Sequence, residues 1–352
     1  MSYCAPDRVL VALSGGVDSS VCVRILQDQG FLVEALVLHF SPAHDKAVAA
    51  AELAARQLGV PLTVRDCQPE FEREVIAPFC RAYCAGRTPN PCVVCNPAVK
   101  FRLLCETADS MGIRYVASGH YARVEQTETG FCVRKALSPA RDQSYMLYRL
   151  PQQILARLLL PVGEFEKPDI RAMAAAAGLA AADAPDSQEI CFIPDGDYPA
   201  YLEARGERGL QGHFIAPDGR DLGPHRGVLH YTVGQRRGLG LALGRPVFVD
   251  SIGADGSIRL AWAGEEYAAA VRLTDLVESG PGLRAGAHYD VKLRSVARGA
   301  GCTVHSRTAD SALVVFDEPQ RAPAPGQAAV LYAGELIAGG GVIDASLKTA
   351  PQ

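Results

Sequence analysis

The segment Val9-Leu-Val-Ala-Leu-Ser14-Gly15-Gly16-Val17-Asp18-Ser19-Ser20 decides the fold, because it joins a strand to a helix through a glycine turn. Residues 8–13 form an apolar run typical of a buried strand, and residues 17–29 carry apolar side chains at helical spacing. Two glycines let backbone N–H groups face a ligand, and the helix N-terminus adds partial positive charge. The segment predicts a phosphate-binding loop, although it lacks the lysine of G-x-x-x-x-G-K-[ST]. The alternative is an ordinary strand-to-helix turn capped by serine.

Strand-like and helix-like segments alternate around this loop. We predict strands over 8–13, 31–40, 61–67 and 115–118, and helices over 17–29, 46–58, 71–83 and 100–111. Strands separated by helices form a parallel sheet, which binds ligands at the carboxyl ends of its strands. From about Tyr198 onward glycine becomes frequent and the helical period fades. Short β-type runs at 247–252, 288–295 and 312–316 predict one or two small β domains there.

Composition limits the class of protein. The chain has 352 residues, 48% hydrophobic and 21% charged, with a net charge of −4, which are values of a globular protein long enough for two or three domains. No apolar run approaches the ~20 residues that span a bilayer, and the N-terminus lacks signal-peptide features, so we expect a cytoplasmic protein with no membrane segment. Its eleven cysteines should then stay reduced, as candidates for catalysis or metal binding. Acidic and basic residues nearly balance, so any RNA contact must use local patches.

Further motifs carry a resemblance to a known family. In chain order they are Gly86-Arg-Thr-Pro-Asn-Pro-Cys92-Val-Val-Cys95-Asn96, Ser118-Gly119-His120-Tyr121, Asp142-Gln143-Ser144-Tyr145, Asp186-Ser187-Gln188-Glu189-Ile190-Cys191-Phe192-Ile193 and Gly234-Gln235-Arg236-Arg237-Gly238-Leu239-Gly240. The Ser-Gly-Gly-Val-Asp-Ser-Ser loop resembles the PP-loop ATP pyrophosphatases. Together, the motifs resemble the tRNA-specific 2-thiouridylases of that superfamily, from residue 8 to about 345.

The resemblance implies an α/β fold and a reaction. The expected fold is an N-terminal HUP-like PP-loop domain with a parallel sheet (1–199), a small central domain (200–270) and a C-terminal β-barrel that contacts tRNA (271–352). The implied enzyme uses ATP to adenylate O2 of the wobble uridine and replaces it with sulfur from a cysteine persulfide, giving 2-thiouridine. Its expected partners are the anticodon arm of tRNA and a persulfide-donating sulfur-carrier protein. Mg²⁺ should accompany ATP, because the loop has no lysine to offset the triphosphate charge, and Asp18 is a candidate to hold it.

Site residues follow from the same match. Cys95 and Cys191 take the positions of nucleophile and persulfide carrier, and an oxidised sample should contain a disulfide between them. The ATP-binding residues would be Ala12, Leu13, Ser14, Gly15, Gly16, Val17, Asp18, Ser19, Leu38 and Gly119. The tRNA-binding residues would be Asn90, Pro91, Cys92, His120, Arg141, Asp142, Gln143, Arg294, Ser295 and Gln327. A residue such as Leu38 is more often ordinary core, and His120 could be an ordinary capped strand end. Arg236 and Arg237 fit either phosphate contacts or a solvated surface pair.

The cysteines leave metal alternatives open. Cys80, Cys84, Cys92 and Cys95 lie within sixteen residues and include one zinc-type C-x2-C pair, but no second pair follows. Cys92 stands where the family commonly has an aspartate, so an acidic role cannot be carried over to it. Cys92, Cys95 and Cys191 could instead hold an iron–sulfur cluster, which we do not favour because Cys95 and Cys191 suffice for the persulfide route.

Two other functions remain as rivals. A PP-loop synthetase that adenylates a small metabolite would need neither the cysteine pair nor an RNA-binding barrel, and tRNA-dependent pyrophosphate release would exclude it. A zinc-holding RNA-binding module would bind stoichiometric Zn²⁺ and no ATP. The short segment 40–46 also departs from the family, whose longer members carry an acidic and aromatic insert there.

Overall fold

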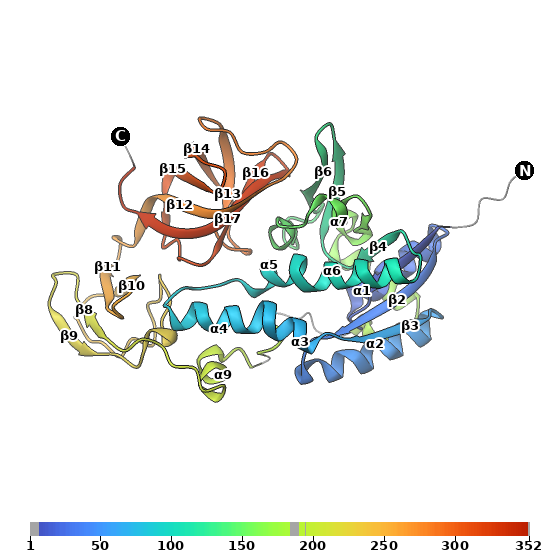
Figure 1. Cartoon of the computed structure of the whole chain (residues 1–352), viewed down its shortest axis with the longest axis horizontal. Helices are drawn as coiled ribbons and strands as arrows, with labels where there is room; N and C mark the ends of the chain where they lie inside the picture. The colour runs from blue at the N-terminus through green and yellow to red at the C-terminus, as the bar shows by residue number, and fades with distance from the viewer. Residues whose placement is uncertain (1–6, 184–189, 194, 351–352) are drawn as a thin grey trace, which may run out of the picture. The chain divides into compact units, whose positions relative to one another are not determined.

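The computed structural model describes residues 7–183, 190–193 and 195–350 (Figure 1). The chain divides into two compact units. The first comprises Met1–Val75, Cys92–Gly196 and Glu335–Ile337, and the second comprises Ile76–Pro91, Asp197–Gly334 and Ala338–Gln352. Residues 184–189 and 194, which include most of the motif before Cys191, lie outside the described part.

The first unit is built on a five-stranded parallel sheet with the strand order β3-β2-β1-β4-β7. Its strands are β1 (Arg8–Ala12), β2 (Leu32–His39), β3 (Leu62–Asp66), β4 (Tyr115–Ser118) and β7 (Leu158–Leu159). Its helices are α1 (Val17–Asp28), α2 (Asp45–Leu58), α3 (Gln68–Phe71), α5 (Pro91–Cys95, whose first residue belongs to the second unit), α6 (Phe101–Ser110), α7 (Gln152–Leu155) and α8 (Lys167–Ala176). The predicted parallel α/β domain is therefore confirmed. An antiparallel hairpin of β5 (Ala122–Thr127) and β6 (Gly130–Lys135), absent from the prediction, adds to this unit.

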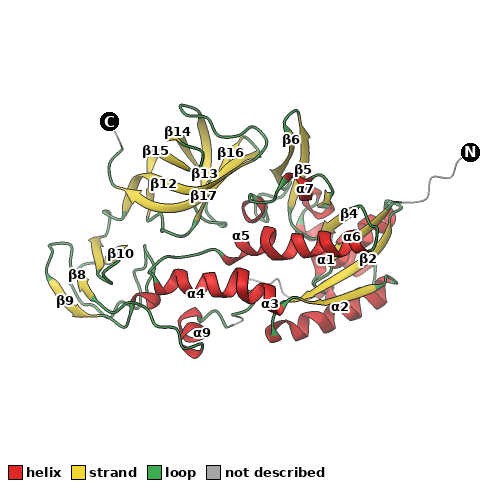
Figure 2. Cartoon of the chain, in the orientation of Figure 1, coloured by secondary structure: helices red, strands yellow, loops and turns green. Residues whose placement is uncertain are grey.

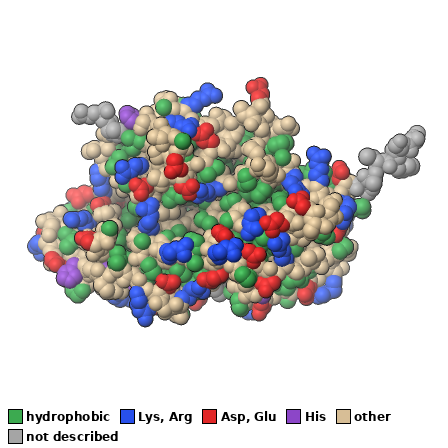
Figure 3. Space-filling view, in the orientation of Figure 1, with side chains coloured by type: hydrophobic (Ala, Val, Ile, Leu, Met, Phe, Trp, Pro, Cys, Tyr) green, Lys and Arg blue, Asp and Glu red, His purple; other side chains and the backbone are tan. Residues whose placement is uncertain are grey.

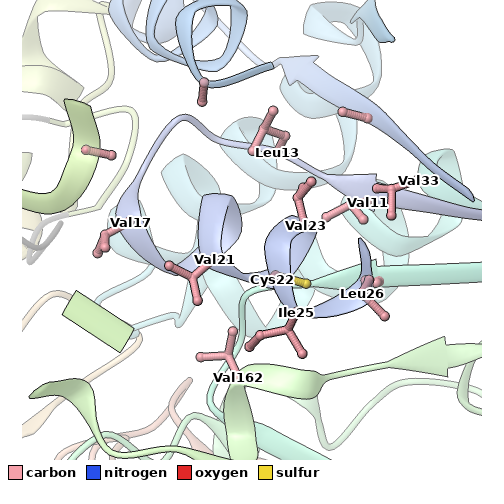
Figure 4. Close-up of a cluster of buried hydrophobic side chains, with 14 of the residues drawn as sticks. Val11, Leu13, Val17, Val21, Cys22, Val23, Ile25, Leu26, Val33 and Val162 are labelled. Carbon is pink, nitrogen blue, oxygen red and sulfur yellow. The ribbon is translucent and has the colours of Figure 1, made fainter. Parts of the chain in front are cut away.

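The core of this unit lies between the central strand and α1 (Figure 4). Val9 and Val11 of β1 are fully buried, as are Val21, Cys22 and Val23 of α1. Each fully buried side chain of this size contributes about 1.5–3 kcal/mol relative to exposure. This packing fixes the end of β1 against the start of α1, which is where the glycine turn lies.

Two helical segments contain wider turns than the sequence predicts. The helix predicted over 71–83 is divided into α3, a π-helix over Glu72–Ile76 and α4 (Ala77–Cys84). A second π-helix, Asn96–Lys100, precedes α6. The first π-helix is followed closely by Pro78, and the second contains Pro97. Proline has no N–H to donate to the preceding turn. Such wide turns are frequent at functional sites.

The second unit is mainly β structure (Figure 2). A four-stranded sheet has the order β10-β11-β8-β9, formed by β10 (Val247–Ile252), β11 (Ile258–Trp262), β8 (His213–Ile215) and β9 (Asp221–Pro224). Six further strands form a barrel closed by pairing of β12 with β17. They are β12 (Tyr267–Glu278), β13 (His288–Lys292), β14 (Ala300–Arg307), β15 (Ser311–Arg321), β16 (Ala328–Ala333) and β17 (Leu336–Leu347). Helices α4 and α9 (Tyr198–Ala204) belong to this unit. The expected C-terminal β-barrel is confirmed, whereas the boundaries at 199/200 and 270/271 stay predictions.

Two properties of the molecule bear on its partners. Within the described ranges, no helix has the length and apolar character needed to cross a membrane. Positive and negative side chains are interspersed over the face shown in Figure 3, so neither sign dominates that face. On this face, contacts with a polyanion would have to come from small groups of side chains.

Candidate active site

A cavity of about 310 Å³ lies in the first unit, at the carboxyl ends of β1, β2 and β4. Its lining residues are Ala12, Leu13, Ser14, Asp18, Ser19, Leu36, Val37, Leu38, Phe40, His44, Ala47, Lys100, Ser118, Gly119, His120 and Gln143. Most of the ATP-binding residues expected from the sequence therefore share one cavity. Gly15, Gly16 and Val17 are not among the lining residues, and the Val17 side chain is buried in the hydrophobic cluster (Figure 4).

The glycine turn is held in shape by its own serines. The Ser14 backbone N–H donates to Ser19 Oγ at 3.2 Å, the two hydroxyls lie 3.0 Å apart, and Ser19 Oγ and Ser20 Oγ both donate to the Gly16 carbonyl. Gly15 has φ +78°, and a Cβ there would lie 2.5 Å from the backbone of α2. A larger side chain at this position would therefore disturb the packing of α2 as well as the loop.

Gly119 explains how the turn after β4 approaches the loop. A Cβ at this position would lie 2.6 Å from the Ser19 backbone nitrogen and 2.8 Å from the Asp18 carbonyl oxygen. The backbone after β4 therefore packs directly against the first turn of α1. Only glycine permits this close approach, which brings both strand ends to one cavity.

Asp18 is already engaged in the first unit. Its two carboxylate oxygens accept hydrogen bonds from Lys167 Nζ at 2.7 and 2.9 Å, and Tyr121 Oη donates to one of them at 2.8 Å. The Lys167 side chain is only 8% exposed and that of Asp18 is 31% exposed, so the ammonium group is buried and the carboxylate is half-buried. A metal ion at Asp18 would have to displace the ammonium group. Binding of Mg²⁺ by Asp18 therefore stays a prediction.

Two basic residues near the cavity were missed by sequence reasoning. Lys100 lines the cavity directly, and Lys167 meets Asp18, although neither belongs to the glycine loop. The loop itself has no lysine, as the sequence shows, but two lysines from elsewhere in the chain lie close to it in the folded unit. The closeness of Lys100 to the Cys-Val-Val-Cys motif was a signal in the sequence, whereas nothing local pointed to Lys167.

His44 also lines the cavity, although the sequence did not predict it as a site residue. Its Nδ1 lies 2.9 Å from Ser41 Oγ, its ring contacts Phe40 and Phe71, and its Nε2 has no hydrogen-bond partner among the described residues. Burial lowers its pKa, with a further contribution from His39, so the ring is neutral at pH 7. His44 comes from the short segment 40–46, which the sequence identified as a departure from the family.

The thiols of Cys92, Cys95 and Cys191 interact with one another in the first unit. Cys95 is buried, whereas Cys191 is exposed as a residue. Loss of hydration raises the pKa of Cys95 to about 12 and that of Cys191 to about 11, and it also raises the pKa of Cys92. Lys100 lowers all three pKa values in part, while the neighbouring thiols raise those of Cys95 and Cys191. The resting thiols are therefore protonated at neutral pH.

The cysteines show no metal-binding arrangement. All ten cysteines that the structure describes are free thiols. Throughout the described ranges, no three His, Cys, Asp or Glu side chains are grouped as ligands for one ion. Cys84 lies instead on α4, with its Sγ 3.6 Å from Glu207. This geometry gives no support to the zinc or the iron–sulfur alternative, and the expected disulfide stays a prediction.

The residues expected to contact tRNA lie in both units. In the first unit, His120 and Gln143 line the cavity. Burial of the His120 ring holds its pKa well below the usual value, and the positive charge of Lys100 lowers the pKa further. Asp142 is buried and accepts from the backbone N–H groups of Ala136 and Ser144, which indicates that it shapes the turn. Arg141 beside it is exposed.

In the second unit, Arg294 is exposed and Ser295 is half-buried in the loop after β13. The backbone of Gln327 donates to Ala324 and accepts from Ile343. Asn90 and Pro91 belong to this unit, and Cys92 begins the next segment of the first. Contact of these residues with tRNA stays a prediction.

A parallel sheet whose first strand ends in a Ser-Gly-Gly turn, with a cavity beside it, defines a nucleotide-binding α/β protein of the PP-loop class. Three family models match the chain: the tRNA methyl transferase HUP domain over 7–195, the tRNA methyl transferase PRC-barrel domain over 200–258 and the aminomethyltransferase beta-barrel domain over 274–343. The chain belongs to the family of the tRNA-specific 2-thiouridylases, as its curated relatives show.

The relatives match over nearly their whole length. The tRNA-specific 2-thiouridylase MnmA of Desulforudis audaxviator is 42% identical, covering 97% of this chain and 99% of that protein. The MnmA proteins of Carboxydothermus hydrogenoformans and Acetivibrio thermocellus are 40% and 39% identical, covering 99% and 96% of this chain and 100% and 99% of those proteins. These matches confirm the resemblance drawn from the motifs.

Proposed function

We propose that this protein adenylates O2 of the wobble uridine of tRNA with ATP and replaces that oxygen with sulfur from a persulfide on Cys191. Family membership makes it a tRNA sulfurtransferase. The observation that supports the finer proposal is that the phosphate loop and the three thiols share one charged residue, Lys100. A nucleotide cavity and a pair of thiols within reach of the same side chain suit adenylation followed by sulfur transfer.

Adenylation comes first, because a uridine carbonyl is a poor electrophile. O2 of the uridine attacks the α-phosphate of ATP, the bond to the β-phosphate breaks, and pyrophosphate leaves. The loop from Ser14 to Ser19 supplies backbone N–H and hydroxyl groups for the phosphates. Mg²⁺ would enter bound to the ATP phosphates, since Asp18 is engaged by Lys167. The uridine must leave its stack to reach the cavity, which costs least in an anticodon loop.

Sulfur transfer then uses the two cysteines. The terminal sulfur of the Cys191 persulfide attacks C2, and AMP departs with the former O2. The Cys95 thiolate attacks Cys191 Sγ, which releases thiolated tRNA and leaves a Cys95–Cys191 disulfide. An external thiol reductant restores both thiols, and a sulfur-carrier protein reloads Cys191. Exposure of Cys191 supports loading from a partner, and burial of Cys95 supports its role as resolving thiol.

Contacts with tRNA belong to the same proposal. Asn90, Pro91 and Cys92 would contact the target base, and Arg141 would contact a tRNA phosphate. In the second unit, Arg294 and Ser295 would contact the anticodon arm. We expect the reaction to take place in the cytoplasm.

Pyrophosphate release tests the first half of the proposal. Incubation with ATP and unmodified tRNA should release pyrophosphate in proportion to tRNA, and omission of tRNA should abolish it. Release stimulated by a small metabolite and unaffected by tRNA would favour a metabolite synthetase and contradict the proposal.

A further inference from the structure

Lys100 occupies an unusual electrostatic position in the first unit. It ends the π-helix Asn96–Lys100 and lines the cavity together with Ser14, Ser19 and Gly119. Asp18, which has the one carboxylate among the described residues that line the cavity, forms an ion pair with Lys167. Lys100 itself makes no ion pair within the described ranges. A half-buried cation without a counter-charge is costly, so this position suits a ligand that brings negative charge.

The same charge also reaches the thiols. Lys100 lowers the pKa of Cys92, Cys95 and Cys191, opposing the larger effect of burial. The backbone N–H of Lys100 adds a hydrogen bond that favours the Cys95 thiolate. Apart from Lys100, the titratable groups that act on Cys95 and Cys191 are other members of this set of three thiols. Because all three thiols are neutral at pH 7, they do not neutralise Lys100 in the resting protein.

We propose that Lys100 is a shared cation, which contacts the β- and γ-phosphates of the bound nucleotide and, once these have left as pyrophosphate, stabilises anionic sulfur on Cys191 and Cys95. The proposal rests on the proposed function, which supplies both anions in sequence. Pyrophosphate leaves before sulfur attacks, so one ammonium group serves each step in turn. While ATP is bound, its phosphates neutralise the Lys100 ammonium group. The thiols then lack a nearby positive charge and stay protonated until adenylation has taken place. Lys100 is thus a positioning and electrostatic residue for sulfur transfer.

Two measurements on the full chain test this role. The first is the dissociation constant of ATP by titration calorimetry. The second is the pH dependence of alkylation of Cys191 and Cys95 by iodoacetamide, resolved by peptide mass spectrometry, with and without a non-hydrolysable ATP analogue. Steric blocking lowers the rate at every pH, whereas an electrostatic effect moves the midpoint of the profile. The variants are Lys100→Gln and Lys100→Arg, with the exposed Lys46→Gln as matched control.

In Lys100→Gln we expect ATP affinity to fall about tenfold and the alkylation midpoints to rise by about one pH unit. Lys100→Arg should keep both values near those of the unchanged protein, because guanidinium retains the charge. The analogue should raise the midpoint in the unchanged protein and leave it unmoved in Lys100→Gln. If Lys100→Gln loses its fold by circular dichroism, Lys100→Met, which keeps an apolar stem, takes its place.

Unchanged ATP affinity or unchanged midpoints in the folded neutral variant would overturn the proposal while leaving the proposed function intact. Failure of the unchanged protein to bind ATP would overturn both. The two failures are distinguishable, because only the second appears without any substitution.

Discussion

Gly119 shows how a missing side chain lets the backbone after β4 pack against the first turn of α1 at the cavity. A methyl group there would lie well inside contact distance of the backbone at Asp18 and Ser19. We predict that Gly119→Ala lowers stability by about 1–3 kcal/mol, as overpacking does, and weakens ATP binding because the start of α1 shifts. Urea unfolding and calorimetry measure the two effects. Gly299→Ala, where a Cβ meets its nearest neighbour at 3.7 Å, is the control, and equal behaviour of the two variants would contradict the account.

Asp18 and Lys167 form a pair whose partners depend on each other. Asp18→Asn keeps the shape but leaves the largely buried Lys167 ammonium without its counter-charge. We predict a loss of about 1–3 kcal/mol in unfolding free energy, partly recovered in Asp18→Asn/Lys167→Met. A double-mutant cycle of unfolding free energies measures this coupling. Strictly additive losses would show that the pair does not act as a unit.

Cys92 stands where the family commonly has aspartate, and burial raises the pKa of its thiol. It therefore remains protonated and cannot serve as a base at neutral pH. We predict that Cys92→Ser retains much of the thiolation activity, since serine can make the same contact to the uracil edge. The comparison is thiolation by both forms after anaerobic purification. A brown protein that loses iron and activity together on this substitution would instead establish the cluster route.

At the scale of elements, an aromatic cluster holds the segment that carries Cys191. The Phe192 ring lies 5.5 Å from that of Phe71, which contacts Phe40 and His44 at the cavity wall. Phe192 and Phe71 are almost fully buried. This packing ties the position of Cys191 to the wall of the nucleotide cavity.

We predict that Phe192→Ala slows sulfur transfer by loosening Cys191, with a stability loss of up to about 3–5 kcal/mol. ATP affinity should change much less than the transfer rate, because the phosphate loop is not part of the cluster. The control is Phe31→Ala, which removes another edge-to-face aromatic pair, with Tyr115, away from the cavity lining. Equal loss of transfer in both variants would assign the effect to general destabilisation.

The elements also show what the sequence can predict. The run 247–252 corresponds to β10 without change, and the ends of the first strands agree within a residue or two, because apolar periodicity and glycine punctuation are local signals. The π-helices were missed because they depend on prolines within an otherwise helical pattern. Lys167 was missed as a member of the site because tertiary packing alone brings it to Asp18 over 149 positions. Lys100 was missed although it lies close to the Cys-Val-Val-Cys motif. The motifs predicted the cavity-lining loop, but not the cations around it.

At the scale of the molecule, the chain combines a catalytic α/β unit with a β-rich unit, and their family models match in the expected order. The catalytic unit holds the cavity and all three thiols, while the β-rich unit carries Arg294 and Ser295. Under the proposed function, the first unit admits the nucleotide and the second contacts RNA through local groups of side chains, which a nearly balanced net charge permits. Adenylation and sulfur delivery can thus be tested within one protein by separate substitutions.

The most direct test of the central claim is mass spectrometry of tRNA nucleosides after incubation with the protein, ATP and a persulfide donor. We expect one sulfur-for-oxygen exchange at the wobble uridine, dependent on ATP. Cys191→Ser should abolish the exchange and carry no persulfide, whereas Cys95→Ser should load persulfide but fail to turn over. Thiolation that proceeds without ATP, or that survives in Cys191→Ser, would contradict the account.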